Sequence, residues 1–132
     1  MREILFRGKA INGIWWYGIP LVFAEDDVCI LQPHSHYKEV EANTVGQYTG
    51  LTDKNGKKIF TKDIVAITAL GDDHHQKGVK TIAVVEDYMG NTCLCIDGKH
   101  QTGTTLYDIS IAHTVEVIGD TTDNPELLKG DG

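Results

Sequence analysis

The segment from Val45 to Val65 constrains the fold of this chain more than any other. It reads V-G-Q-Y-T-G-L-T-D-K-N-G-K-K-I-F-T-K-D-I-V, a dense succession of turn formers and short apolar runs. Asp53 begins the strongest turn signal, and the pair Asn55-Gly56 tolerates the positive φ that tight turns require. The segment contains no recognisable catalytic group. It therefore predicts a defined backbone path without predicting an activity.

Short runs of branched and aromatic residues, bounded by turn formers, predict β-strands along most of the chain. These runs are 4–7, 14–17, 20–23, 28–31, 45–48, 59–60, 63–67, 81–86, 92–97 and 114–118. The stretch 104–111 is compatible with a strand or a short helical turn. Asn124 and Pro125 predict the start of a short helix, since Asn can cap and Pro is tolerated at the first helical position. The expected fold is mainly β: a small antiparallel barrel or sandwich with a short C-terminal helical turn.

The polar, irregular stretch 32–44 is the best candidate for an internal boundary. It begins with Gln32-Pro33 and separates the aromatic first third of the chain from the rest. We expect residues 1–44 to form an N-terminal subdomain built on a β-hairpin, ending in a loop or linker that could be partly mobile. Residues 45–132 are then a barrel-like core with a short tail. A second polar loop is expected at 71–78.

Charge argues against a phosphate-binding surface. The chain carries a formal net charge of −7, with a pI near 5.2, whereas nucleic-acid binders neutralise phosphates with clustered Lys and Arg. Lys57-Lys58, in a polar turn, is read as a solvated loop. A nucleic-acid-linked role stays open as an alternative, because small β-barrels often bind single strands through aromatic residues and a basic groove.

Cysteine usage and hydropathy bear on the compartment. The three cysteines are an odd number, and Cys93 and Cys95 share one face of a predicted strand, where they are poorly placed to bond each other. No signal peptide and no apolar run of about 20 residues is visible. We expect a reduced, cytoplasmic protein that does not interact with membranes.

A zinc site is the most specific metal hypothesis that the sequence allows, and the spacing does not favour it. The candidate ligands are His34, His36, His74, His75, Cys93 and Cys95. Zinc takes four N or S ligands, commonly as close pairs converging from two places. Adjacent histidines point apart in an extended chain, and Cys-x-Cys is not the usual knuckle. The turn at Asp53 also lacks the spacing of a calcium loop. We expect no metal and no cofactor.

An enzymatic activity has equally little support. Cys29 or Cys93 with a histidine, or Ser35 with His34 or His36, could form a nucleophilic pair, but the sequence shows no nucleophile elbow or oxyanion feature. Asp63 is the most interesting single carboxylate, and we interpret it as an acceptor of backbone N–H bonds that fixes the entry into a strand. We expect no catalytic residue.

Trp15, Trp16 and Tyr17 form the one aromatic cluster of the sequence. Consecutive strand residues point to opposite faces, so burying one tryptophan turns the other outward. The outward one can pack under the 32–44 segment or can lie in an interface, where aromatic residues are enriched. The three residues are therefore a candidate interface for a homo-oligomer or another partner.

Several stretches resemble the signatures of the YopX-like proteins of phages and prophages. The central signature is matched by 47–60 with the strand entry 63–65, the C-terminal one by 115–119 with 124–128, and the usual start by 2–7. The matching positions that we take as structural are Gln47, Tyr48, Gly50, Asp53, Asn55, Gly56, Asp63, Gly119, Asn124 and Pro125. Thr61-Lys62 departs from the pattern, which commonly has an acidic residue followed by glycine.

The resemblance implies a small, mainly β protein that is encoded by a phage or prophage in a bacterial host and is able to self-associate. It implies no established activity. The function we expect from the sequence is that of an accessory protein acting through contacts with itself or with an unknown phage or host protein.

Overall fold

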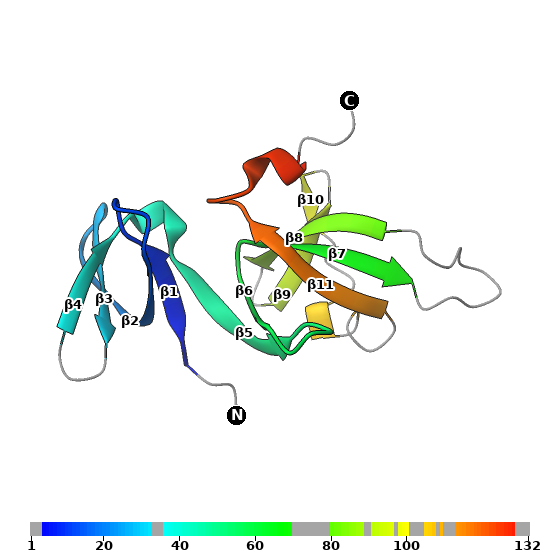
Figure 1. The fold of residues 1–132 in the computed structure, drawn as a ribbon, viewed down its shortest axis with the longest axis horizontal. Helices are drawn as coiled ribbons and strands as arrows, with labels where there is room; N and C mark the ends of the chain where they lie inside the picture. The colour runs from blue at the N-terminus through cyan, green and yellow to red at the C-terminus, as the bar shows by residue number, and fades with distance from the viewer. Residues whose placement is uncertain are drawn as a thin grey trace. The chain divides into compact units, whose positions relative to one another are not determined.

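The structure is a computed structural model of residues 1–132, and it describes residues 4–32, 36–69, 80–88, 91–96, 98–100, 105–107, 109 and 113–128. The described residues form two antiparallel sheets, with strand orders β4-β3-β2-β1-β5-β6 and β10-β9-β8-β7-β11 (Figure 1). The mainly β prediction is confirmed. Each strand order has two ends, so in this part of the chain both sheets are open rather than closed barrels. No helix among the described residues is long and apolar enough to cross a membrane.

The chain divides into two compact units, Met1–Gly50 and Leu51–Gly132. The division falls inside β5 (Gly46–Thr52), the strand that continues from one unit into the other. The boundary that the sequence analysis placed after Thr44 lies just before this strand. We describe each unit by itself.

The N-terminal unit is an antiparallel meander of four strands, extended by a fifth strand that pairs with the first. Its strands are β1 (Phe6–Lys9), β2 (Trp15–Ala24), β3 (Asp27–Gln32), β4 (His36–Val40) and the first part of β5. β1 and β2 form the expected hairpin, with Phe6 opposite Gly18 and Lys9 opposite Trp15. β2 is one continuous strand, where the sequence predicted two, at 14–17 and 20–23. Pro20 does not break it because the pairing with β1 ends at Gly18, so Pro20 lies where β2 has only β3 as a neighbour.

The segment 32–44 is structured where it is described, so the prediction of an irregular linker is wrong there. It holds β4 and the 3₁₀ turn η1 (Ala42–Thr44), while residues 33–35 lie outside the described residues. The buried Thr44 fixes this segment to β1: the Lys9 N–H donates to Thr44 Oγ1 (2.8 Å), and the Thr44 hydroxyl donates to the Glu41 carbonyl (2.6 Å). The Glu41 N–H also donates to the Lys9 carbonyl (2.9 Å). Polarity suggested a loop, but pairing with β3 and these hydrogen bonds order the segment.

The core of the N-terminal unit is small. Val28, Ile30 and Val40 are buried together, on β3 and β4. Four half-buried hydrophobic residues pack against them: Phe6, Trp16, Ala42 and Val45.

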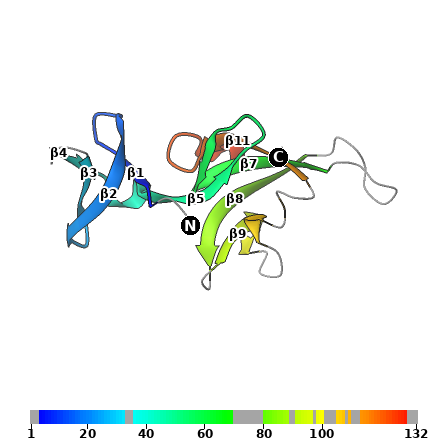
Figure 2. The same ribbon diagram turned by 90° about the horizontal axis from the view of Figure 1, so that it is seen from below.

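The C-terminal unit contains the five-stranded sheet β10-β9-β8-β7-β11 and also β6, the end strand of the six-stranded sheet. Its strands are β6 (Lys58–Phe60), β7 (Asp63–Ala69), β8 (Lys80–Tyr88), β9 (Asn91–Ile96), β10 (Lys99–His100) and β11 (His113–Asp120). β7, β8 and β9 run side by side in both views (Figures 1 and 2), with Val65 opposite Ala83 and Val85 opposite Leu94. The expected hairpin of 81–86 with 92–97 is therefore present. Within the ambiguous stretch 104–111, the described residues 106, 107 and 109 are helical. The polar loop expected at 71–78 lies outside the described residues.

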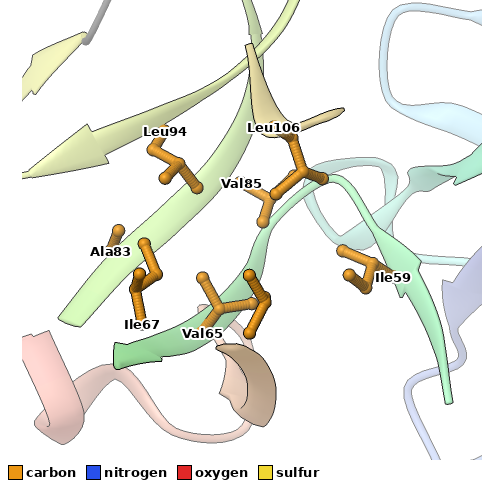
Figure 3. Close-up of a cluster of buried hydrophobic side chains, with 8 residues drawn as sticks. Ile59, Val65, Ile67, Ala83, Val85, Leu94 and Leu106 are labelled. Atoms are coloured by element: carbon orange, nitrogen blue, oxygen red, sulfur yellow. The ribbon is translucent and has the colours of Figure 1, made fainter. Parts of the chain in front are cut away.

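One hydrophobic cluster fills the C-terminal unit. Its eight buried members are Ile59, Val65, Ile67, Ala83, Val85, Leu94, Leu106 and Val115, and seven of them are labelled in Figure 3. Side chains from the four adjacent strands β9, β8, β7 and β11 converge on one face of the sheet, together with Ile59 of β6 and the helical residue Leu106. The chain then ends its described part in a second 3₁₀ turn, η2 (Pro125–Leu128), which is the short C-terminal turn that the sequence predicts.

Candidate functional site

Asp53, at the start of the signature turn, connects that turn to a distant strand. Its Oδ1 accepts the N–H groups of Asn55 and Lys57, both at 2.9 Å, and its Oδ2 accepts the Val117 N–H of β11 at 3.0 Å. The side chain is only 7% exposed. Burial acts to raise the pKa of Asp53, but the three N–H donors and the charge of Lys57 outweigh it and hold the pKa below its ordinary value. We call this arrangement the Asp53 clasp.

Asp63 has the role that the sequence analysis assigned to a short acidic residue at a strand entry. It is the first residue of β7, is 1% exposed, and accepts the Phe60 N–H on Oδ2 at 2.7 Å. The hydrogen bond closes the two-residue turn between β6 and β7. The carboxylates of both acidic residues in the signature segment thus accept hydrogen bonds from backbone N–H groups.

Lys62, inside that turn, has a φ of +75°, a conformation that glycine adopts without strain and other residues rarely adopt. Its own backbone is held on both sides, because its N–H donates to the Val85 carbonyl and its carbonyl accepts the Thr121 N–H. Burial also lowers the pKa of its amine. This is the position at which the resemblance leads one to expect glycine, so the departure noted in the sequence has a structural cost.

The C-terminal signature is held by close packing of Asn124 on Gly119. A Cβ on Gly119 would lie 2.5 Å from Asn124 Oδ1, so no side chain fits there without a shift. Asn124 Oδ1 accepts the Asp120 N–H (3.2 Å). The Asn124 carbonyl accepts the Leu127 N–H in the first turn of η2, which begins at Pro125. The remaining signature residues, Gln47, Tyr48 and Gly50, lie in β5. These residues build the scaffold, so a candidate contact surface has to be sought in other regions of the protein.

The two faces of the N-terminal sheet differ in a way that defines such a surface. The pairing register puts Ile19, Leu31 and Tyr37 in one row across β2, β3 and β4. Trp15 and Tyr17 lie on the same face, because they alternate with Trp16, whose face carries the buried Ile30. We call the face formed by Trp15, Tyr17, Ile19, Leu31 and Tyr37 the outer face.

The outer face is mainly apolar and aromatic, with Trp15 and Leu31 half-buried and its other three residues exposed. Tyr17 is 44% exposed, Ile19 is 43% and Tyr37 is 61%. Of the twelve large hydrophobic residues that are exposed in the described part of the chain, eight belong to the N-terminal unit: Ile4, Ile11, Ile14, Tyr17, Ile19, Val22, Phe23 and Tyr37. Concentrated exposed apolar surface of this kind marks interaction sites.

The two tryptophans are engaged with cations in the structure. The Arg7 guanidinium lies 4.8 Å from the centre of the Trp15 ring, and Lys9 Nζ lies 5.9 Å from it. On the other face, Lys38 Nζ lies 4.6 Å from the centre of the Trp16 ring. Cation–π contacts of this geometry hold both rings in place. Trp15 is therefore a fixed part of the outer face and Trp16 of the opposite, core-facing side, while Tyr17 and Tyr37 are the more accessible aromatic side chains of the outer face.

A groove of about 730 Å³ opens elsewhere on the N-terminal unit. Its lining combines three carboxylates with amide and aliphatic side chains: Ala10, Ile11, Asn12, Asp26, Glu39, Val40, Glu41, Ala42 and Asn43. The groove is thus an electronegative surface, the opposite of what a phosphate group requires.

The candidate metal ligands and nucleophiles are dispersed or lie outside the described residues. His34, Ser35, His74 and His75 are not described, His36 is exposed on β4, and Cys93 and Cys95 lie on β9. The described residues contain no group of three or more His, Cys, Asp or Glu that could hold a metal ion. Burial, together with nearby carboxylates, raises the pKa of Cys29, Cys93 and Cys95, and a protonated thiol is a poor nucleophile.

Sequence reasoning found Trp15, Trp16 and Tyr17 but missed the partners that complete the outer face. Ile19, Leu31 and Tyr37 come from strands whose register was unknown, and Tyr37 was assigned to a linker. Alternation within 36–40 was the available signal, since its odd positions share one side of an extended chain.

The fold and these sites define a small, mainly β protein of two antiparallel sheets whose signature residues are structural. The chain belongs to the YopX family: the family model described as YopX protein matches residues 12–129. Among solved structures, protein yopX from Bacillus subtilis is similar, with a TM-score of 0.58 and 20% identity, over 98% of this chain and 100% of that one. Protein EF1440 from Enterococcus faecalis gives a TM-score of 0.57 at 20% identity, with the same coverage. At this identity the likeness concerns the fold. A search of curated protein sequences found no match.

Proposed function

We propose that this protein acts through protein–protein contacts made by the outer face of its N-terminal unit, and that it self-associates through this face. The observation that carries the proposal is the open row Ile19–Leu31–Tyr37 beside Tyr17. These side chains are held on a paired three-strand scaffold rather than on a loop, so an approaching partner meets a surface that is already ordered.

The composition of the outer face matches that of known interface cores. Tyrosine and tryptophan are enriched at interfaces, and they contribute large contact areas at a low cost in side-chain entropy. A second copy brings the same face, and a two-fold contact between identical faces is the commonest arrangement in homo-oligomers. The cations beside Trp15 contact its ring, and the exposed tyrosine and aliphatic side chains provide the contact area.

Size-exclusion chromatography with light scattering tests the proposal. The wild-type protein is compared with the double variant Ile19→Ser/Tyr37→Ser, in which two exposed side chains of the outer face are truncated. Tyr107→Ser is the matched control, since Tyr107 is 53% exposed in the C-terminal unit. Circular dichroism of each variant confirms that the fold is retained.

We expect the wild type and Tyr107→Ser to elute at the same mass, above that of one chain, and the double variant to elute at the mass of one chain. A wild type of one-chain mass at all concentrations, or a folded double variant of unchanged mass, would remove self-association from the proposal. The contact function is then tested with a different protein as the partner. The required result is that this partner binds the wild type and Tyr107→Ser but does not bind the double variant.

A nucleic-acid-linked role in phage DNA metabolism or regulation is the second candidate function. The adjacency of Arg7 and Lys9 to Trp15 favours it, because cations beside an aromatic ring also serve single-strand binding. Against it, Arg7 is only 7% exposed and the net charge is −7. Fluorescence anisotropy of a labelled oligothymidylate tests this role. Binding at low salt that weakens as the salt concentration rises would support it, and an anisotropy that does not change when the protein is added would exclude it.

The family membership supports a proposal for the setting of the contact function. We place the protein in the cytoplasm of a bacterial host as a phage or prophage accessory protein that does its work without catalysis. What supports this is the YopX family membership together with three thiols whose pKa values are raised.

A further inference from the structure

The chain contains two Asn-Gly pairs, Asn12-Gly13 and Asn55-Gly56, and each lies in a tight turn. Asn-Gly is a reactive pair: the glycine nitrogen, unhindered by a side chain, can attack the asparagine Cγ and expel ammonia. The sequence alone gives no reason for the two sites to differ, since each asparagine is followed by the same residue. The structure separates them.

We propose that Asn55, in the signature turn, is a site of spontaneous deamidation and isoaspartate formation, and that it reacts faster than Asn12 in the folded protein. The backbone arrangement of the two sites is alike. Gly13 N–H donates to the Ala10 carbonyl (2.9 Å) and Gly56 N–H to the Asp53 carbonyl (3.0 Å), and both glycines have positive φ, +89° and +81°. The difference therefore comes from the asparagine side chains and their surroundings.

The two side chains differ in freedom. Asn12 Oδ1 accepts the Ile14 N–H at 3.1 Å, which fixes the orientation of the amide. The Asn55 side chain is exposed and makes no hydrogen bond to the part of the chain that the structure describes; its contact with Asp53 is through its backbone N–H. The Asn55 amide is free to rotate Cγ toward the Gly56 nitrogen.

The two sites also differ in nearby charge. The attacking nitrogen must lose its proton, so the reaction passes through an anion that nearby positive charge stabilises. Asn55 is flanked by the exposed cations of Lys54, which pairs with Glu116 at 3.7 Å, and of Lys57, and its backbone nitrogen lies 2.9 Å from the Asp53 carboxylate. Asn12 lines the groove that also holds the carboxylates of Asp26, Glu39 and Glu41, and one cation, Lys9, lies near Gly13. The balance of charge is therefore more favourable to reaction at Asn55 than at Asn12.

The reaction has a structural consequence that only the Asn55 site carries. The bond from the Gly56 nitrogen to Asn55 Cγ forms as the bond from Cγ to the amide nitrogen breaks, and that nitrogen leaves as ammonia with the proton of the attacking nitrogen. Water then opens the cyclic imide to aspartate or isoaspartate. Isoaspartate lengthens the backbone between the two N–H groups that Asp53 Oδ1 accepts, and it adds a negative charge beside the Asp53 carboxylate. Both changes weaken the Asp53 clasp.

Peptide mass spectrometry during incubation at neutral pH and above tests the proposal. The folded wild type is aged beside the same protein in concentrated urea, and the peptides containing Asn12 and Asn55 are quantified after separation of aspartate and isoaspartate forms. The variant Lys54→Gln/Lys57→Gln removes the two exposed cations, and Glu25→Gln, a charge change outside the groove lining, is the matched control.

In the folded wild type we expect Asn55 to deamidate about five-fold faster than Asn12, since the charge effects at exposed sites are modest. In urea the ratio falls, and in the lysine variant Asn55 slows while Asn12 does not change. Aged wild-type protein rich in isoaspartate at position 55 also unfolds at lower urea. A folded ratio equal to or below the ratio in urea, or an unchanged Asn55 rate in a folded lysine variant, would overturn the proposal.

Discussion

The C-terminal unit buries eight residues in one hydrophobic cluster, whereas the N-terminal unit buries three. Exposed apolar surface has the reverse distribution, with eight of the twelve exposed large hydrophobic residues of the described chain in the N-terminal unit. The two buried carboxylates of the described chain, those of Asp53 and Asp63, also lie in the C-terminal unit, where they accept backbone N–H groups. The C-terminal unit therefore packs more of its large hydrophobic side chains into a core, and the N-terminal unit exposes more of them to solvent. We infer that stability and contact function are separable by mutation.

The largest expected loss of stability comes from Asp53→Asn. Asp53 uses both carboxylate oxygens as acceptors, and an amide has only one acceptor oxygen, so an NH₂ group would face an N–H donor. We expect the free energy of unfolding to fall by about 2 kcal/mol, the range for hydrogen bonds to charged groups. Urea denaturation measures it. Asp26→Asn, at an exposed position, is the control for charge, and equal losses in both variants would contradict the clasp.

The Asp53 clasp also predicts how stability depends on pH. The pKa of Asp53 is held below its ordinary value in the folded protein, so the stabilisation is complete above the unfolded pKa of about 3.9 and is lost as the pH falls through the folded pKa. The stability difference between wild type and Asp53→Asn should therefore narrow below about pH 4. Urea midpoints measured at several pH values test this, and a difference that persists undiminished at the lowest pH argues against it.

A smaller loss is expected in the N-terminal unit from Thr44→Val. Valine keeps the shape of threonine but removes the hydroxyl that links Lys9 and Glu41. Because these groups are neutral, the expected cost is about 1 kcal/mol. Thr52→Val, at an exposed position, is the matched control. If the two variants unfold at the same urea concentration, the 36–44 segment is not fixed by Thr44.

A gain in stability is expected from Lys62→Gly. Glycine accepts the φ of +75° without strain, and the change also removes an amine whose pKa burial lowers. We expect a gain of about 1 kcal/mol. Lys62→Ala removes the same amine but keeps the strain, so it should lack most of this gain. If Lys62→Ala raised the free energy of unfolding more than Lys62→Gly, the destabilisation at this position would come from the buried amine and not from the backbone conformation.

The smallest effect on stability is expected from the outer face. Ile19→Ser and Tyr37→Ser change exposed side chains, and each should alter the free energy of unfolding by no more than about 0.5 kcal/mol. Chemical denaturation at low protein concentration, where association is minimal, gives this value. A loss as large as that of Asp53→Asn would place these residues in the core and not on a contact surface.

The sequence predicted the elements whose signals are local. Turn chemistry located Asp53 to Gly56 and the entry at Asp63, branched residues located most strands, and Asn124-Pro125 located η2. All of these depend on residues within a few positions of one another. The mainly β fold and the family follow from the same signals.

What could not be predicted depends on long-range pairing. The polar composition of 36–40 favoured a loop, and only its pairing with β3 makes it β4. Predicting the outer face requires knowing the pairing register of three strands. The hydrogen bond that the Val117 N–H donates to Asp53 joins residues 64 positions apart in the sequence. Pro20 suggested a break because its neighbours in the sheet were unknown. The signature segment therefore identified the scaffold, and the outer face that we propose as a contact surface follows only from the strand register.

The measurement that tests the separation of roles most directly is light scattering of Ile19→Ser/Tyr37→Ser beside Asp53→Asn, each paired with its urea midpoint. We expect the outer-face variant to have the mass of one chain and a wild-type midpoint, and the Asp53 variant to keep the wild-type mass with a lowered midpoint. An outer-face variant that keeps the wild-type mass, or an Asp53 variant that loses association while still folded, would contradict the account.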